Sequence, residues 1–346
     1  MVNDTHPLFK ESEGFKPFVY PWAYDAYLRQ FQIRWAPEEV PLANDLEDFN
    51  QKLLPTEQEF VRQILRYFTQ GDMTVAAGYV DKYLPLFKAN EVRMMLLEFA
   101  AMEANHIRSY ALLLDTLGMP ESEYQAFHQY DEMQAKHDYM MQSRYYGKAG
   151  GMTPVETLLL DLACFSLFGE GLQLYSSFVM LLNFSRQKLL KGMGSINQWS
   201  VRDEVLHVES MTRLFVTVAK DHPEAWNDKV KQAVSNVCQQ IVLMEDAFID
   251  LAYKAGTARN LEAADVKAYV RYIANCRLNS VGLDPLYPSH PPDVIPWMAE
   301  YLELDGHTNF FEEAVTNYSQ CSLTGTWPSP TESRLFDART ILSATL

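Results

Sequence analysis

The sequence predicts an all-helical protein whose core is one helical bundle. Three observations support this fold class. Gly and Pro stand at intervals typical of helix ends, apolar residues recur at helical spacing between them, and strand signals are nearly absent. The predicted helices are long and the loops between them are short, a combination typical of helical bundles.

Capping signals and helix breakers place the helices along the chain. Thr56 and Glu59 form a Thr-x-x-Glu pair behind Pro55, which predicts a capping box at the start of the first long helix. Pro85 disrupts this helix near its end, and Thr153 opens a later helix with a cap of the same kind. The helices predicted after the first cover about 90–117, 122–146, 153–183, 196–220, 223–255 and 262–283.

The helical pattern breaks down from residue 285 onward, where Pro, Ser and Thr become frequent. The final residues have the character of a mobile chain end. We therefore expect one helical domain over residues 1–320 and a flexible C-terminal tail over residues 321–346.

The charge balance excludes several classes of partner. The 346 residues include 29 Lys and Arg against 45 Asp and Glu, a formal net charge of -16. Such an acidic chain is not expected to bind nucleic acid or to dock electrostatically on an anionic membrane, because both surfaces attract basic proteins. Hydrophobic residues make up 48% of the chain, which is typical of a packed protein rather than a disordered one.

Cysteines and apolar segments indicate the compartment. The four cysteines lie far apart without a Cys-x-x-Cys pair, so we expect neither a cysteine-only zinc site nor a disulfide scaffold, and we interpret the chain as cytoplasmic. The N-terminus has no secretory signal. The most apolar segment, 158–184, is interrupted by Asp161 and Glu170, so its uncharged stretches are too short to span a membrane.

Two Glu-x-x-His units lie on separate predicted helices. Glu103 and His106 form the first unit, and Glu204 and His207 form the second. A spacing of three residues places both side chains of each unit on one helix face. A single unit of this kind is weak support for a metal site, because a solvated charged face has the same pattern.

Two further carboxylates, Asp72 and Glu170, lie in apolar helices upstream of the two units. The order of carboxylate helix and Glu-x-x-His helix therefore occurs twice, which is the ligand pattern of di-iron carboxylate bundles, with Asp72 in place of one Glu. Four carboxylates in an apolar core are costly to bury, and two divalent cations would neutralise them. Oxygen-rich ligands with one imidazole for each ion favour iron or manganese over zinc or calcium.

Tyr110 follows His106 by about one helical turn on the same face. A phenol beside an oxygen-activating metal pair could be oxidised to a radical, although a core tyrosine with a bonded hydroxyl would have the same spacing.

These residues together resemble the small, radical-generating beta subunit of class I ribonucleotide reductase. The resemblance covers about residues 18–320. It rests on Asp72, Glu103-x-x-His106-x-x-x-Tyr110, Glu170 and Arg202-Asp203-Glu204-x-x-His207, and also on Ile33-Arg34-Trp35-Ala36-Pro37, Asn275-Cys276-Arg277-Leu278, Ile295-Pro296-Trp297 and His307-Thr308-Asn309-Phe310-Phe311.

The resemblance implies a fold, a function and partners. It implies a ferritin-like bundle that holds a di-metal site in a four-helix core, with two iron ions for each chain or with manganese or a mixed pair. The subunit would activate molecular oxygen, store an oxidising equivalent on Tyr110 and pass it to a larger catalytic subunit, which reduces ribonucleotides to deoxyribonucleotides. The family is homodimeric and docks to the large subunit through its C-terminal tail.

The resemblance also assigns roles to single residues. Asp72, Glu103 and His106 would bind one metal, and Glu170, Glu204 and His207 the other, with Glu103 and Glu204 as bridges. Trp35 and Asp203 would form a hydrogen-bonded relay from His106. In the tail, Tyr318 is the candidate redox tyrosine and Trp327 a weaker candidate, while the apolar anchors of segment 333–346 suit docking to a partner groove.

Three other functions stay open from the residues alone. A ferritin-type iron-storage protein has a similar metal pattern but needs neither Trp35 nor a long tail. A di-metal oxidase acting on a bound lipid or hydrocarbon would need an apolar tunnel to the metals. A purely structural helical protein would leave the buried carboxylates without a purpose.

Overall fold

The structure is a computed structural model and describes residues 6–142, 151–288 and 295–302. The side chains of residues 69, 70, 72, 74, 125, 141 and 142 also lie outside the described residues. The described residues all belong to one compact unit, Met1–Gly306. No residue of the second unit, His307–Leu346, is among the described residues.

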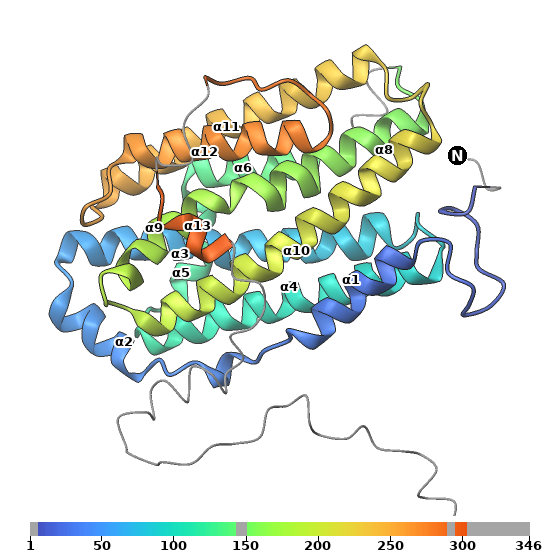
Figure 1. The fold of residues 1–346 in the computed structure, drawn as a ribbon. Helices are drawn as coiled ribbons and strands as arrows, with labels where there is room; N and C mark the ends of the chain where they lie inside the picture. Colours follow the sequence, from blue (N-terminus) through green and yellow to red (C-terminus); the bar gives the residue numbers. More distant parts are fainter. Residues whose placement is uncertain (1–5, 143–150, 289–294, 303–346) are drawn as a thin grey trace, which may run out of the picture. The chain divides into compact units, whose positions relative to one another are not determined.

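Helices account for the regular structure of the described residues, in which no strand occurs, so the predicted all-helical class is confirmed (Figure 1). The α-helices are α1 (Pro21–Gln32), α2 (Ala43–Glu47), α3 (Pro55–Gly78), α4 (Asn90–Thr116), α5 (Ser122–Ala126), α6 (Asp131–Gln142), α8 (Pro154–Leu162), α9 (Tyr175–Arg186), α10 (Lys191–Asp221), α11 (Asp228–Ala255), α12 (Ala263–Ser280) and α13 (Met298–Leu302). Two short 3-10 helices are η1 (Pro37–Glu39) and η4 (Phe127–Gln129). The π-helices are η2 (Asp48–Lys52), η3 (Tyr79–Tyr83) and η6 (Ala163–Gln173).

Capping hydrogen bonds explain where the long helices begin. At α8, Thr153 and Glu156 exchange the two bonds of a capping box, as predicted. The box predicted on Thr56 and Glu59 is wrong, because the N-cap of α3 is Leu54, two residues earlier. The backbone N–H of Leu54 donates to Glu57 at 2.8 Å.

The helix predicted over 153–183 is not continuous. Between α8 and α9 the chain forms the long π-helix η6, in which the hydrogen bonds span one residue more than in an α-helix. Close packing accompanies this change, because a Cβ at Gly169 would lie 2.7 Å from Met140 and one at Gly171 would lie 2.9 Å from Arg277. Glu170 stands between these two glycines, so the irregular backbone carries a predicted ligand.

Four segments form the centre of the bundle. Helix α3 packs against α4, α4 packs against α10, and η6 packs against α3 and α10, as Figure 1 shows. Helix α1, which the sequence did not predict, covers α4, and the α11–α12 pair covers η6. This arrangement brings the two Glu-x-x-His helices and the Glu170 segment to one place in the core.

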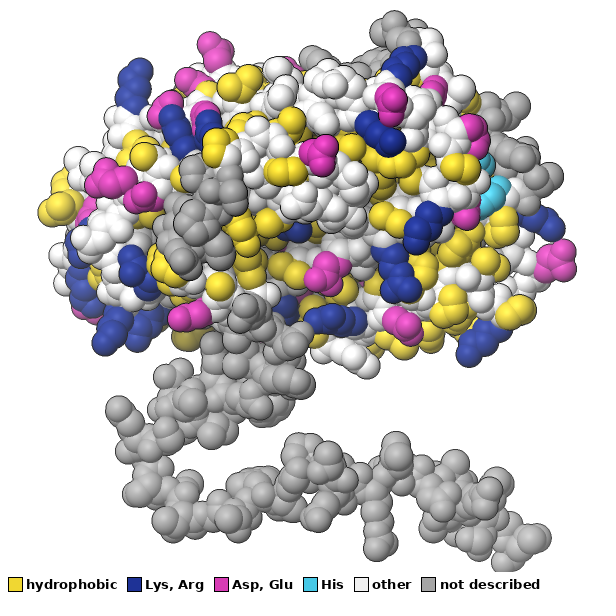
Figure 2. All heavy atoms as spheres, turned by 45° about the horizontal axis from the view of Figure 1, so that its top comes forward, with side chains coloured by type: hydrophobic (Ala, Val, Ile, Leu, Met, Phe, Trp, Pro, Cys, Tyr) yellow, Lys and Arg dark blue, Asp and Glu magenta, His cyan; other side chains and the backbone are white. Residues whose placement is uncertain are grey.

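Charged side chains of both signs lie on the surface. On the face shown in Figure 2, basic and acidic side chains are interspersed with hydrophobic ones. Among the described helices, none has both the length and the continuous apolar character that crossing a bilayer requires.

Candidate metal centre

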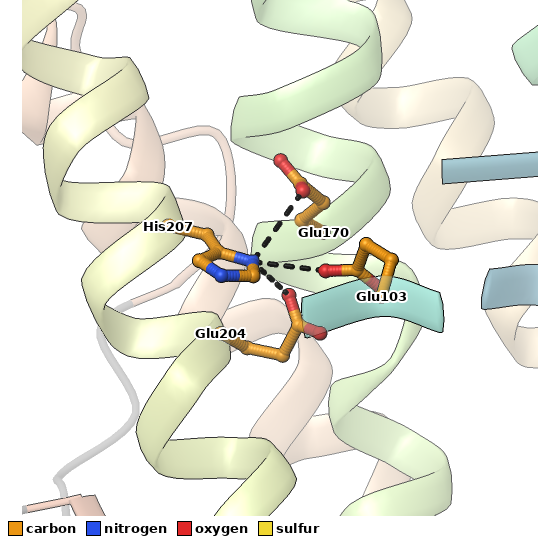
Figure 3. Close-up of side chains that lie close together, drawn as sticks. All are labelled: Glu103, Glu170, Glu204 and His207. Atoms are coloured by element: carbon orange, nitrogen blue, oxygen red, sulfur yellow. Dashed lines mark ion pairs between the residues drawn. The ribbon is translucent and has the colours of Figure 1, made fainter. Parts of the chain in front are cut away.

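Five of the six predicted ligands come together inside the bundle. Helix α4 supplies Glu103 and His106, η6 supplies Glu170, and α10 supplies Glu204 and His207. All five residues are at most 1% exposed. Ligand atoms of Glu103, Glu170, Glu204 and His207 lie within 4.8 Å of one another, and Figure 3 shows the three carboxylates converging on the imidazole.

The two imidazoles face the same two carboxylates. Nδ1 of His207 lies 2.9 Å from Oε1 of Glu103 and 3.6 Å from Oε2 of Glu204. Nδ1 of His106 lies 3.5 Å from Oε2 of Glu103 and 3.3 Å from Oε1 of Glu204. Glu103 and Glu204 therefore each present one oxygen to each histidine. Glu170 approaches His207 alone, with its Oε1 3.9 Å from Nδ1.

Several ligand atoms at this centre lack a hydrogen-bond partner although they are buried. They are both carboxylate oxygens of Glu103, Oε2 of Glu170, Oε2 of Glu204 and both ring nitrogens of His207. Leaving buried polar atoms unsatisfied costs about 1–3 kcal/mol for each group, and more when the group is charged. Carboxylate oxygens and imidazole nitrogens are donors that divalent metals accept, so this donor set fits cations held between the helices.

The pKa shifts show how the charges are balanced by protons. Burial raises the pKa of Glu170 well above its usual range, and the neighbouring Glu204 and Glu103 raise it further. Burial also opposes ionisation of Glu103, but the nearby imidazoles of His106 and His207 outweigh it and lower its pKa to about 2. Burial lowers the pKa of His207, but Glu103 and Glu204 raise it to about 10. Metal binding would displace these protons, since metal ligands must be deprotonated.

Of the remaining predicted residues, some lie outside the described part of the chain and the others lie within it. Asp72 lies on α3, but its side chain is outside the described residues. The tail candidates Tyr318 and Trp327 and the segment 333–346 are outside them as well. Tyr110 is fully buried on α4, its ring stacks on Phe68 at 4.5 Å, and its hydroxyl donates to Asn197 Oδ1 at 3.3 Å.

Trp35, Asp203 and His106 form a connected chain of contacts. Trp35 Nε1 donates to Oδ2 of Asp203 at 2.8 Å, and Nε2 of His106 lies 3.1 Å from the same oxygen. Burial opposes ionisation of Asp203, but its hydrogen bond to His106 prevails and lowers its pKa. Gln30, which the sequence did not single out, donates to the other oxygen of Asp203 at 3.2 Å.

The sequence pattern did not single out Tyr79, a buried tyrosine beside the centre. Tyr79 donates its hydroxyl to Oε1 of Glu170 at 2.5 Å. It follows Asp72 by the same interval at which Tyr110 follows Glu103, so spacing could have identified it. Asn197, the acceptor for Tyr110, carries no comparable signal.

Comparisons with known proteins agree on sequence and fold. A family model described as "Ribonucleotide reductase, small chain" matches residues 13–296. The chain is 44% identical over 332 residues to a probable ribonucleoside-diphosphate reductase small subunit of Invertebrate iridescent virus 3, which covers 93% of this chain and 88% of the viral protein. It is 36% identical over 350 residues to its counterpart in Invertebrate iridescent virus 6, covering 92% of this chain and 97% of that protein. The solved ribonucleotide reductase R2 subunit from Clostridium botulinum shares the fold, with a TM-score of 0.74 and 21% identity over 82% of this chain and 89% of that one.

Proposed function

The chain belongs to the ribonucleotide reductase small-chain family, and from this membership we propose that it activates molecular oxygen at a pair of metal ions and stores an oxidising equivalent on Tyr110. As the small subunit of a ribonucleoside-diphosphate reductase, it would deliver that equivalent to a large catalytic subunit. The observation that carries the proposal is the buried group of Glu103, Glu170, Glu204 and His207, in which both oxygens of Glu103, one oxygen each of Glu170 and Glu204, and both ring nitrogens of His207 have no hydrogen-bond partner.

We assign the ligands in two sets. Asp72, Glu103 and His106 hold one ion, and Glu170, Glu204 and His207 hold the other. Bridging by Glu103 and Glu204 is supported by their geometry, because each directs one oxygen toward His106 and the other toward His207. When bound, the ions would supply electrons that reduce molecular oxygen, and the oxidising equivalent that results would be stored on the protein.

We assign two iron ions to each chain. Manganese, or a mixed manganese and iron pair, could use the same ligands. Oxygen-rich ligands with one imidazole for each ion suit both metals. Asp203 supports this ligation because it accepts the Nε2–H of His106 and so leaves the Nδ1 lone pair directed at the carboxylates.

Storage of the oxidising equivalent is assigned to Tyr110 because its surroundings exclude water. Its phenol is fully buried, its ring stacks on Phe68, and the ring centroid of Phe178 lies 5.2 Å from that of Phe68. Asn197 accepts a hydrogen bond from the hydroxyl and so orients the phenol. Burial of this kind protects a reactive group from side reactions with solvent.

Transfer to the large subunit is assigned to Trp35 and Asp203, which connect His106 to the N-terminal segment. The onward step through Tyr318, with Trp327 as the weaker candidate, and docking through residues 333–346 rest on the sequence and the family. So do the homodimer and the division into a domain over 1–320 and a tail over 321–346.

The proposal is tested by reconstitution. The metal-free protein is titrated without oxygen with Fe(II) and, in parallel, with Mn(II), and we expect two ions for each chain. Exposure to oxygen should then produce a tyrosine radical signal by electron paramagnetic resonance, and the treated protein should support deoxyribonucleotide formation with the large subunit. Failure to bind two ions would contradict the proposal, and an iron core stored without a radical would favour the iron-storage alternative.

A further inference from the structure

We propose that Tyr79 is a positioning residue of the metal centre, which holds the carboxylate of Glu170 by a hydrogen bond to Oε1, the oxygen that lies 3.9 Å from Nδ1 of His207. The inference rests on the proposed function, since it takes Glu170 as a ligand. The hydroxyl of Tyr79 donates to Oε1 at 2.5 Å, whereas the buried Oε2 has no hydrogen-bond partner. The two oxygens of one carboxylate are thus in different situations before any ion binds.

The backbone explains how a phenol from α3 reaches Glu170. Tyr79 is the first residue of the π-helix η3, which continues directly from α3. The preceding residue, Gly78, lies against the ring of Phe165 in η6, and a Cβ at this position would collide with that ring. Only glycine at residue 78 allows the two segments to approach so closely. Two π-helices from distant parts of the chain therefore meet at the Tyr79–Glu170 hydrogen bond.

The ring of Tyr79 is held on several sides. Phe99 lies at 6.0 Å and Phe165 at 6.4 Å, both edge to face, and the imidazole of His207 lies at 6.2 Å with an interplanar angle of 80°. Tyr79 is fully buried. Edge-to-face packing of this kind fixes ring orientation, so the hydroxyl cannot swing away from Glu170 without disturbing the core.

A held donor on one carboxylate oxygen has a consequence for coordination. A carboxylate binds a cation through one or both of its oxygens. Once Glu170 is ionised as a metal ligand, the phenol O–H gives Oε1 a charge-assisted hydrogen bond, which is about twice as strong as a neutral one. The phenol is therefore expected to hold the Glu170 carboxylate in the orientation that faces His207. Loss of the phenol should weaken binding of the ion that Glu170 and His207 would share.

The neighbouring Tyr83 provides a matched control. It lies in the same π-helix, is also fully buried, and packs 6.2 Å from the ring of Tyr79. Its hydroxyl donates to the backbone oxygen of Asp161 at 3.2 Å rather than to a ligand side chain. Replacing either tyrosine by Phe removes one hydroxyl from the same buried cluster, but only the Tyr79 hydroxyl bonds to Glu170.

The test measures Mn(II) binding to the metal-free full-length chain without oxygen, by following free Mn(II) with electron paramagnetic resonance. We expect Tyr79→Phe to lower the affinity for one of the two Mn(II) ions by roughly 10–100-fold, the usual effect of losing a hydrogen bond to a metal ligand. Tyr83→Phe should bind both ions like the unaltered protein. Equal affinity of Tyr79→Phe and Tyr83→Phe for both ions would overturn the proposal.

A second measurement needs no variant. In a crystal structure of the Mn(II)-loaded protein, Glu170 should bind an ion while its carboxylate stays within hydrogen-bond distance of the Tyr79 hydroxyl. A Glu170 that binds the ion without this hydrogen bond would overturn the inference even if Tyr79→Phe failed to fold. Failure of the proposed function is a different result, because the unaltered protein would then bind fewer than two ions or form no radical.

Discussion

Trp35 donates its indole N–H to Oδ2 of Asp203 at 2.8 Å, although the two residues lie 168 positions apart in the chain. The same oxygen is 3.1 Å from Nε2 of His106, so one carboxylate oxygen joins the N-terminal segment to the metal centre. Trp35 is only 6% exposed, and its ring lies 6.1 Å from that of His106. This chain of contacts separates two roles that mutations can test, metal binding and transfer of the oxidant.

Trp35→Phe should leave metal binding and the radical on Tyr110 intact but reduce turnover with the large subunit. The substitution keeps an aromatic ring and removes the donor to Asp203. We expect a loss of roughly tenfold or more in turnover, equal to about 1.4 kcal/mol in activation free energy. Deoxyribonucleotide formation measures it, with Trp226→Phe as a control, because Trp226 packs on Phe215 instead. Unchanged turnover would remove Trp35 from the pathway.

Tyr110→Phe should abolish the stored tyrosine radical without preventing metal binding. The variant keeps the ring that stacks on Phe68 and loses the hydrogen bond to Asn197, so the free energy of unfolding should fall by only about 1 kcal/mol. Electron paramagnetic resonance after oxygen exposure is the measurement. Tyr175→Phe, at another fully buried tyrosine, is the control and should keep the signal. A persistent signal in Tyr110→Phe would place the radical elsewhere.

Removing the metals should lower stability. Ions that bind only the folded chain add about 2.7 kcal/mol to the free energy of unfolding at a free concentration one hundred times Kd. Thermal unfolding with and without Mn(II) should therefore show a clear shift in Tm for the unaltered protein. The variant Glu204→Gln/His207→Gln, which lacks two of the proposed ligands, should show a smaller shift. An identical shift in that variant would indicate binding at another place.

A buried ion pair away from the metal centre should be important for stability. Lys136 of α6 and Glu245 of α11 pair with neither side chain exposed, Ser176 donates to the same carboxylate, and the ammonium lies 3.7 Å from the ring centroid of Tyr67. Lys136→Met leaves a buried carboxylate without its cation and should lower the free energy of unfolding by about 3–5 kcal/mol, measured in urea. Lys136→Met/Glu245→Gln should recover most of the loss, because no charge is then left buried. Equal losses in both variants would contradict this account.

The same pair predicts a pH dependence. Burial raises the pKa of Glu245 above its usual 4.5 and lowers the pKa of Lys136 below its usual 10.5. The folded chain thus holds more protons on Glu245 than the unfolded chain, so this contribution to stability falls as pH rises from 4.5 through the raised pKa. Lys136 in the folded chain holds fewer protons, so its contribution rises from the lowered pKa toward pH 10.5.

Unfolding curves of the unaltered protein and of Lys136→Met/Glu245→Gln, compared at each pH, isolate these two contributions. The difference in their free energies of unfolding should decrease above pH 4.5 and increase again as pH approaches 10.5. A difference independent of pH would show that neither group titrates differently in the two states.

Local spacing explains what could be predicted from the sequence. The helix predicted over 90–117 agrees with α4, because apolar periodicity, Gly118 and Pro120 act within a few residues of one another. The pairing of Glu103 with His106 on one face follows from the rise and turn of any α-helix. Such features depend on chain geometry alone, so the fold class and the two Glu-x-x-His units needed no tertiary structure.

Tertiary packing decided the rest. The π-helix around Glu170 follows from the close approach of its flanking glycines to other helices, and a periodicity argument assumes regular α-turns instead. The bonds from Tyr79 to Glu170 and from Trp35 to Asp203 join residues far apart in the chain, whose meeting depends on how whole helices pack. The sequence by itself therefore determined which residues share a helix face. Only the folded bundle decided which faces meet, because that choice minimises the combined cost of burying many side chains at once.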